Sequence, residues 1–233
     1  MAKGQPEGPT IGQVLDEFLA DEKERLSART YHRYESVIQL LRLCLEDYLT
    51  PSDPALRKAV DDAQRAGAED AVCRLCPPRE IASGLGEFFG WFMVRKVIAG
   101  QELMRAAGTV THRLGKWLYE RGYIDAEGAE YFDAETTSLG RALPKATDLR
   151  NRLAAWVEWQ PAVDSEVTYD GHFQILAISD LGWKIESVLD SLEGVVAVPA
   201  ELRHPQQVGW EVSGVIAETP QGLRWVEVWN VYP

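Results

Sequence analysis

Apolar residues recur every three or four positions over two stretches at the start of the chain, a spacing typical of amphipathic helices. The first stretch covers residues 11–26 and follows Thr10, which forms a capping-box pattern with Gln13. The second begins after Ser27, a favourable N-cap residue, and ends near Pro51. We therefore expect two helices, the second buried through Tyr31, Tyr34, Val37, Ile38, Leu41, Cys44, Leu45 and Tyr48.

Helical spacing continues as far as Gly122, where a glycine is suited to end a helix. A surface helix is predicted after Ser52 or Asp53, either of which can cap it, with Pro54 in its first turn and Gly67 at its end. An aromatic core helix is expected from residue 83, through Leu85, Phe88, Phe89 and Phe92. Thr109 is predicted to cap the last helix of this part, with Val110, Leu114, Trp117 and Leu118 inward.

Residues 125–162 read as an acidic linker followed by a connecting helix. A short helix is expected near residues 129–132. Pro144 is expected to break the chain, because proline lacks the N–H that a helix interior needs. Thr147 is then predicted to cap a helix that carries Leu149, Leu153, Trp156 and Val157.

From Tyr169 onward the pattern alternates as in strands. Five short strands separated by glycine-containing turns suggest a small closed barrel of OB, SH3-like or TRAM-like type. Gly214 lies inside one strand and predicts a bulge at which the strand bends. The expected strands are residues 171–178, 183–188, 195–198, 210–216 and 223–231.

The predicted class is therefore α+β, with an all-α bundle followed by a five-stranded β-barrel. The expected division is a disordered lead at residues 1–9, a helical domain at 10–124, the linker and connecting helix at 125–162, and an acidic barrel at 163–233.

Charge is distributed unevenly along the chain, whose formal net charge is −12. Residues 84–124 hold six Lys/Arg against three Asp/Glu, whereas residues 163–233 hold three against eleven. Polyanion binding requires positive charge, so any phosphate contact is expected in the first half. The acidic second half favours a protein or a basic surface as its partner.

Two further features concern the environment of the protein. No apolar run approaches the roughly 20 residues needed to span a bilayer, and the first nine residues lack the apolar region of a secretory signal. Three cysteines in such a chain favour reduced thiols, and hence a cytoplasmic location without a membrane partner.

Cys73 and Cys76 form a single C-x-x-C motif. This spacing lets two thiolates converge on one metal ion or form a redox pair. No second C-x-x-C or C-x-x-H follows, and no strand precedes the motif. Two buried, unreactive thiols are therefore favoured over a metal site, and no cofactor is predicted.

The pattern Ser27-x-x-Thr30-x-x-x-Tyr34 after an amphipathic helix resembles the SAM-like core-binding domain of tyrosine recombinases and phage integrases. Residues 109–124, which include Arg113, Trp117 and Gly122, are similar to the closing helix of that domain. The resemblance covers residues 10–124, with residues 51–82 as an insertion. It implies a helical domain that clasps duplex DNA through basic and hydroxyl side chains. The residues that it suggests are Arg29, Thr30, Arg33, Thr111, Arg113 and Lys116.

The chain departs from that family in its second half, where the strand-exchange residues should follow. His172 and His204 are not followed by x-x-Arg, so recombinase activity is excluded. The four histidines form no H-x-x-x-H or H-E-x-x-H pattern, and the sequence contains no G-x-S-x-G motif. We therefore expect no enzyme activity, although a site assembled from distant residues leaves no sequence motif.

The sequence thus favours a non-catalytic binding protein, in which the helical domain contacts duplex DNA and the acidic barrel docks a protein. An alternative is a scaffold protein that binds no nucleic acid. Trp183, Trp210, Trp225 and Trp229 also suggest a base-stacking platform on the barrel, but its acidity favours tryptophans that fill the core.

Overall fold

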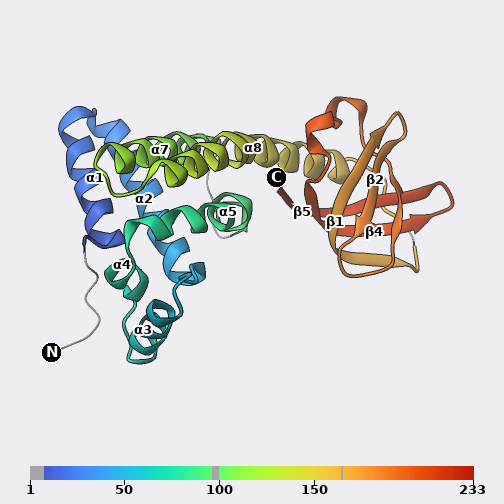
Figure 1. Cartoon of the computed structure of the whole chain (residues 1–233). Helices are drawn as coiled ribbons and strands as arrows, with labels where there is room; N and C mark the ends of the chain where they lie inside the picture. Colours follow the sequence, from blue (N-terminus) through green and yellow to red (C-terminus); the bar gives the residue numbers. More distant parts are fainter. Residues whose placement is uncertain (1–7, 96–99, 164) are drawn as a thin grey trace. The chain divides into compact units, whose positions relative to one another are not determined.

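The structure is a computed structural model and describes residues 8–95, 100–163 and 165–233. The chain forms two compact units, Met1–Arg141 and Ala142–Pro233, called here the helical unit and the barrel unit. The predicted α+β class is confirmed, with helices first and a five-stranded sheet last (Figure 1). The lead predicted at residues 1–9 lies largely outside the described residues.

The first helices of the helical unit begin where the capping residues predict. Thr10 and Gln13 form the expected capping box before α1, and Ser27 Oγ accepts a hydrogen bond from the Thr30 N–H before α2. The carboxylate of Asp53 caps α3, and Gly67 follows its end in the left-handed conformation. These helices are α1 (Ile11–Arg25), α2 (Ala28–Tyr48), α3 (Pro54–Arg65) and α4 (Ala71–Leu75).

The aromatic stretch is buried as predicted but is not one regular helix. It divides into a 3₁₀ turn η1 (Pro78–Gly84), α5 (Leu85–Glu87), a π-helical turn η2 (Phe88–Phe92) and α6 (Met93–Arg95). A Cβ atom at Gly84 would lie 2.5 Å from Leu45 Cδ2 on α2, so the chain approaches that helix more closely than a larger residue permits. Helical periodicity identified the buried face, but it did not reveal these changes in winding.

The helix expected from Thr109 begins earlier, as α7 (Gln101–Glu120). Thr109 lies inside it and does not cap it, because its hydroxyl donates to the carbonyl of Arg105 one turn back. The predicted end is confirmed. Gly122 adopts φ +72°, and the Tyr123 N–H donates to the Leu118 carbonyl, as in a glycine-terminated helix.

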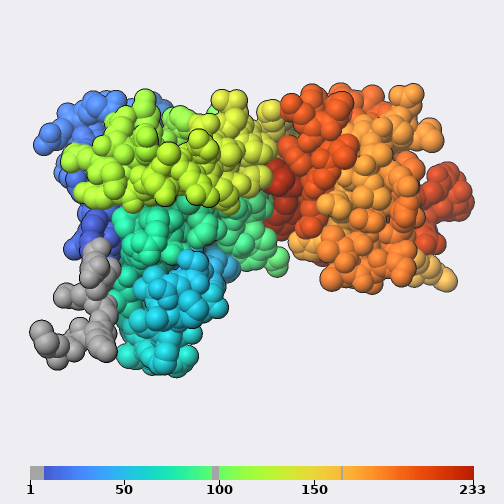
Figure 2. All heavy atoms as spheres, viewed as in Figure 1, coloured from blue at the N-terminus to red at the C-terminus, as the bar shows by residue number. Residues whose placement is uncertain are grey.

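Residues 126–158 form one helix, α8 (Ala126–Glu158), so the predicted break at Pro144 is wrong. Proline leaves the carbonyl four residues earlier, that of Gly140, without its usual helical donor. The Gly140 carbonyl instead packs on α7, where a Cβ atom at Gly108 would lie 2.9 Å from its oxygen. Thr147 is also interior, since its hydroxyl donates to the Leu143 carbonyl. The two glycines let α7 and α8 approach closely, and the helices form one continuous surface in Figure 2.

The barrel unit contains a ring of five strands in the order β1-β2-β3-β5-β4, with β4 paired back to β1. The pairs are antiparallel except β3 with β5, which are joined at Val196 and Leu223 alone. All five strands lie close to their predicted positions. They are β1 (Thr168–Ser179), β2 (Gly182–Ser187), β3 (Glu193–Val196), β4 (Glu211–Thr219) and β5 (Gly222–Tyr232). Between β3 and β4 lie the short turns η3 (Ala200–Leu202) and η4 (Pro205–Gln207).

The second half of α8 completes the core of the barrel unit. Ala146, Leu149 and Leu153 are buried in one cluster with the inward-facing strand residues. Arg150 Nε donates to the carbonyl of Trp229 on β5 at 2.9 Å. The predicted bulge is confirmed, because the β4–β5 register shifts between Ser213 and Gly214.

Candidate functional site

Arg113, one of the predicted phosphate contacts, belongs to the packing of α1 against α7. Its Nε donates to Glu22 Oε1 at 3.0 Å, and Nη1 lies 3.6 Å from Glu120. The Glu22 side chain is only 1% exposed and also pairs with Arg25. A buried carboxylate is costly unless it is paired, so Arg113 contributes to keeping Glu22 inside the protein.

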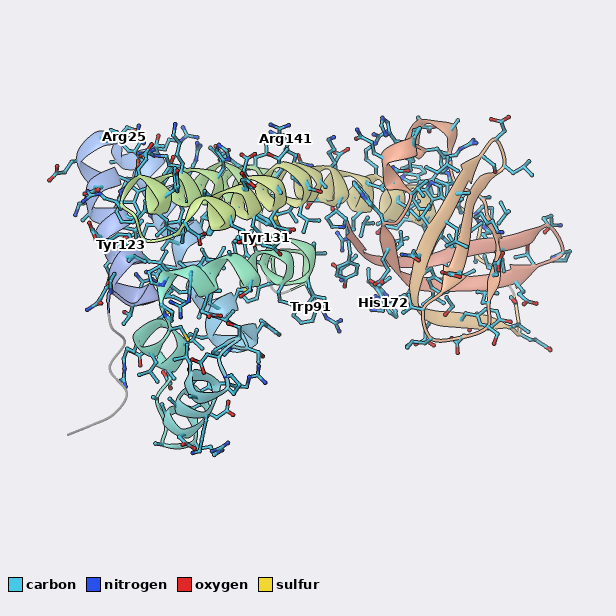
Figure 3. All side chains as sticks on the ribbon, viewed as in Figure 1. Arg25, Trp91, Tyr123, Tyr131, Arg141 and His172 are labelled. Carbon is cyan, nitrogen blue, oxygen red and sulfur yellow. The ribbon has the colours of Figure 1, made fainter. Side chains whose placement is uncertain are left out.

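A second group of contacts joins the same two helices. The Trp117 indole N–H donates to Asp21 at 2.9 Å, and Arg121 pairs with both Asp21 and Glu17. The hydroxyl of Tyr123, labelled in Figure 3, donates to Glu17 at 2.6 Å. The hydrogen bond from Trp117, followed by the contacts of Arg121, holds the pKa of Asp21 below its usual value. This basic surface of α7 is therefore matched by carboxylates of the same unit.

Arg29 and Arg33 lie on one face of α2, as predicted, and a single carboxylate faces both. Arg33 donates to Glu102 on α7, and Arg29 Nη2 lies 3.7 Å from the same carboxylate. The Thr30 hydroxyl is within hydrogen-bonding distance of Ser27 Oγ, at 3.0 Å. The structure thus brings these candidates together, and it places a negative charge between them.

The two remaining candidates differ in exposure. Thr111 is fully buried, and its hydroxyl has no hydrogen-bond partner in the described part of the chain. Its prediction as a phosphate contact is wrong, because the side chain faces the core and not the surface. Lys116 is exposed and lies 4.0 Å from Glu120 one turn later.

The C-x-x-C thiols are buried, together with that of Cys44. Burial raises the pKa of Cys76 and that of Cys44 to about 12 each. The pKa of Cys73 is also raised, first by burial and then by a hydrogen bond with Glu46. Glu46 additionally accepts the backbone N–H of Cys73 at 2.7 Å, which caps α4. Within the described ranges, no group of three or more His, Cys, Asp or Glu is arranged to hold a metal ion.

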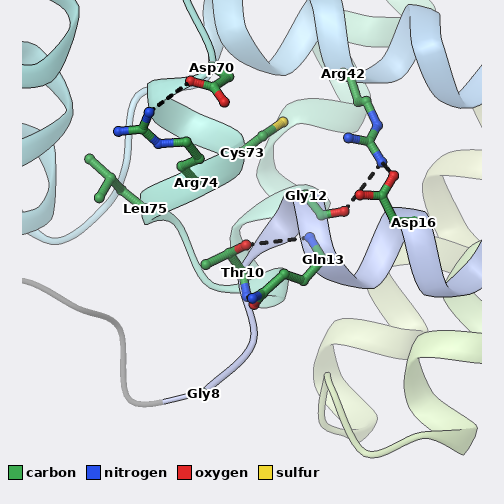
Figure 4. Close-up of a pocket in the computed structure, with 10 residues that line it drawn as sticks. All are labelled: Gly8, Thr10, Gly12, Gln13, Asp16, Arg42, Asp70, Cys73, Arg74 and Leu75. Carbon is green, nitrogen blue, oxygen red and sulfur yellow. Dashed lines mark hydrogen bonds and ion pairs between the residues drawn. The ribbon is translucent and has the colours of Figure 1, made fainter. Parts of the chain in front are cut away.

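A cavity of about 690 Å³ opens where α1 passes α4 (Figure 4). Arg42 reaches it from α2, donating to the carbonyl of Gly12 at 3.2 Å and to Asp16. Arg74 and Asp70 form a second ion pair on another wall. The lining residues come from three separate parts of the chain, residues 8–16, Arg42 and residues 70–75, so periodicity did not predict the cavity. Its charged groups are paired with one another.

Two histidines lie beside carboxylates. His112 Nδ1 is 3.3 Å from Asp133, and Thr136 Oγ1 is 3.4 Å from the same nitrogen. The Thr136 hydroxyl donates to the Phe132 carbonyl at 2.7 Å, so it is not an activated nucleophile. On the barrel, His172, labelled in Figure 3, pairs with Glu211 and stacks on Tyr232. Each carboxylate orients an imidazole, but neither arrangement includes the nucleophile of a catalytic triad.

Two of the four tryptophans of the barrel fill its core and are not available for base stacking. Trp183 and Trp225 are at most 1% exposed, and Trp225 packs edge-on against Phe173. Trp210 is half-buried against the same core, and Trp229 is 40% exposed. The core-filling interpretation of these residues is therefore confirmed for Trp183 and Trp225.

No helix in the described part of the chain combines the length and the apolar content needed to cross a bilayer. Comparison with family models, with curated proteins and with solved structures finds no match to this chain.

Proposed function

We propose that this chain is a non-catalytic binding protein whose acidic barrel unit docks a protein partner of opposite charge. The barrel unit, residues 142–233, carries six Lys/Arg against thirteen Asp/Glu. Opposite charge accelerates the encounter of two proteins and restricts the choice of partner. A polyanion would be repelled by the same surface. A cytoplasmic location, which the free cysteines favour, is part of this proposal.

The excess of carboxylates on the barrel unit carries the proposal, and the internal pairing of the basic residues predicted to meet DNA weighs against a nucleic-acid partner. Arg29 and Arg33 share Glu102, and Arg113 is held by Glu22 and Glu120. A basic patch marks a nucleic-acid interface, whereas each of these arginines faces a carboxylate of its own unit. The pairing therefore favours the scaffold alternative over a DNA-binding protein.

The strand order supports an OB-type barrel among the three types predicted. Strands β1, β2 and β3 are consecutive antiparallel neighbours, and β4 returns beside β1, which is a Greek key. A five-stranded Greek-key barrel is the OB architecture. Such a barrel is a scaffold on which binding surfaces vary, so it fixes no ligand by itself.

The proposal is tested with the full chain and two fluorescently labelled probes. One is an 18-residue amphipathic helix of Leu and Lys, and the other is a 20-base-pair duplex. We expect the peptide to bind and its Leu/Glu counterpart not to bind in anisotropy titrations at 50 and 200 mM salt. Absence of peptide binding, or duplex binding that is tighter and falls steeply with salt, would overturn the proposal.

Duplex DNA binding by the helical unit is the second candidate, in line with the integrase resemblance. It is favoured by the exposure of its ion pairs: the Arg29 side chain is 81% exposed and that of Glu102 is 66% exposed. Exposed pairs contribute at most about 1 kcal/mol, so phosphate can compete with Glu102 for both arginines.

The test of this candidate is Glu102→Gln in the full chain, with duplex anisotropy over a salt series. If α2 contacts phosphate, the substitution tightens binding about two- to fivefold, because it removes a competing charge. Arg29→Ala with Arg33→Ala then weakens it on every sequence. Arg113 is left unchanged, since its loss would unpair the buried Glu22. Equal, negligible binding by all variants would exclude the candidate.

A further inference from the structure

Exposed apolar side chains are concentrated on the β2–β3 hairpin of the barrel unit. Three of the eleven exposed large hydrophobic residues in the described part of the chain lie on this hairpin, and a fourth lies in the turn just before β2. Leu181 precedes β2 and is 77% exposed, and Leu189 at the hairpin tip is 80% exposed. Val188 and Val195 complete the group. Scattered surface hydrophobic residues are ordinary, but such a concentration on one element indicates an interaction surface.

Hydrogen bonds from the Ser187 side chain and from β1 hold the hairpin tip, so these apolar residues are presented on an ordered turn. Ser187 Oγ accepts the N–H groups of Leu189 and Asp190 at 3.4 and 3.0 Å. The Val188 N–H donates to the His172 carbonyl on β1 at 2.9 Å, and the Ser187 N–H donates to Leu192 at 2.8 Å. An ordered loop loses little conformational entropy when a partner binds.

Strand register sets the charge beside this apolar group. Lys184 lies opposite Val195, and Glu186 lies opposite Glu193, all on the outward side of the hairpin. Lys184 Nζ pairs with Glu193 at 2.7 Å. Among the described residues, neither Glu186 nor Asp190 has a basic group within ion-pair distance, and Glu186 interacts with Lys184 only at longer range. Two carboxylates directly opposite each other repel, and a cationic partner relieves that repulsion.

We propose that the outer face of the β2–β3 hairpin, formed by Val188, Leu189 and Val195 with Glu186 and Asp190, docks a basic protein segment that inserts apolar side chains between its cations. This inference rests on the proposed function and names the surface and the chemistry of its partner. The apolar residues supply the burial, and the carboxylates select lysine or arginine over acidic segments.

The test uses the full chain and the labelled Leu/Lys peptide already described. Val188→Ser combined with Leu189→Ser should raise Kd at least about tenfold, because the buried apolar surface is lost. Glu186→Gln combined with Asp190→Asn should raise Kd about three- to tenfold and flatten its dependence on salt. The matched control is Val208→Ser, which removes a half-exposed valine of the same unit outside the hairpin. It should leave Kd unchanged.

The outcomes separate this inference from the proposed function. If the wild-type chain binds no basic peptide, the proposed function fails. If it binds but the hairpin variants match the wild type, the function stands and this surface is wrong. A Lys/Ser peptide that binds as well as the Leu/Lys peptide would contradict the apolar contribution. If sedimentation shows that the wild-type chain dimerises and that the Val188/Leu189 double variant is monomeric, the surface binds a second copy. That result would also overturn the inference.

Discussion

Caps and ion pairs stabilise the helical unit through residues at very different separations along the chain. Ser27, Thr10 and Gly122 act on backbone groups only a few residues away. Arg113 and Glu22 are 91 positions apart, and their pairing depends on how α1 packs against α7. Candidate site residues could therefore be selected by type and helical face, whereas their ionic partners could not be foreseen.

Asp21 provides a test of the α1–α7 contacts through pH. Its pKa is lowered in the folded state by Trp117 and Arg121, so its stabilising effect is present above its unfolded pKa of about 3.9. The effect is lost as pH falls through the lower, folded pKa. The stability advantage of the wild type over Asp21→Asn should be largest at pH 7 and shrink below about pH 4.

Urea unfolding at pH 7, 5, 4 and 3 measures this difference, which should not exceed about 1 kcal/mol because the side chain is partly exposed. Glu24→Gln, on the exposed side of α1, is the control and should track the wild type throughout. A difference that is constant from pH 7 to pH 3 would contradict the role of the carboxylate.

A second residue-scale prediction concerns the reactivity of the buried thiols. Because the pKa values of Cys44 and Cys76 are raised to about 12, almost no thiolate is present at pH 8. Native protein should react with a disulfide reagent such as DTNB only as fast as it unfolds, and all three thiols should react promptly in guanidinium chloride. Rapid loss of two thiols from native protein, or one bound zinc per chain by elemental measurement, would instead favour a C-x-x-C site.

Secondary-structure elements were predicted well where a simple period decides them and poorly where packing does. The strands and the first three helices match because alternation and amphipathicity follow from a single buried face. Pro144 and Thr109 were misread because each signals a helix end only when the surrounding helix lacks other support. The packing of α8 on both sides of Pro144, through Phe132 and Leu149, supplies that support.

Pro144→Ala tests this interpretation of α8. The substitution restores an N–H for the Gly140 carbonyl and removes a ring from the helix interior, so the free energy of unfolding should rise by about 2 kcal/mol. Urea denaturation followed by circular dichroism measures the change. Ser138→Ala, on the exposed side of α8, is the matched surface control and should change the free energy of unfolding little. A destabilised Pro144 variant would indicate that the proline is required for the packing of α7 on α8.

At the scale of the whole molecule, the order of helices and barrel was predictable, and the division between them was not. The predicted barrel domain starts at residue 163, whereas the compact unit starts at Ala142. The difference arises because the helical spacing of Leu149 and Leu153 shows that they are buried, but not whether they pack in the helical unit or in the barrel unit. Both residues pack with the strands.

Two fragments of the chain, one starting at each boundary, test which boundary encloses a unit that folds by itself. Residues 142–233 should fold, with a cooperative thermal transition and dispersed amide resonances, because the helix and the strands share one core. Residues 163–233 should lack a cooperative transition, since removal of Ala146, Leu149 and Leu153 leaves apolar strand residues in water. Equal thermal stability of the two fragments would show that the helix is dispensable to the barrel.

The placement of Leu149 and Leu153 ahead of the strands that bury them also bears on synthesis at the ribosome. Translation delivers this half of α8 before β1, and the ring of strands closes only after β5, which pairs with both β3 and β4, has emerged. Roughly 70 residues, or several seconds at typical elongation rates, separate the helix from its partners. During that interval its apolar side is open to chaperones and to neighbouring nascent chains, so slower decoding between residues 160 and 230 should increase aggregation of this protein.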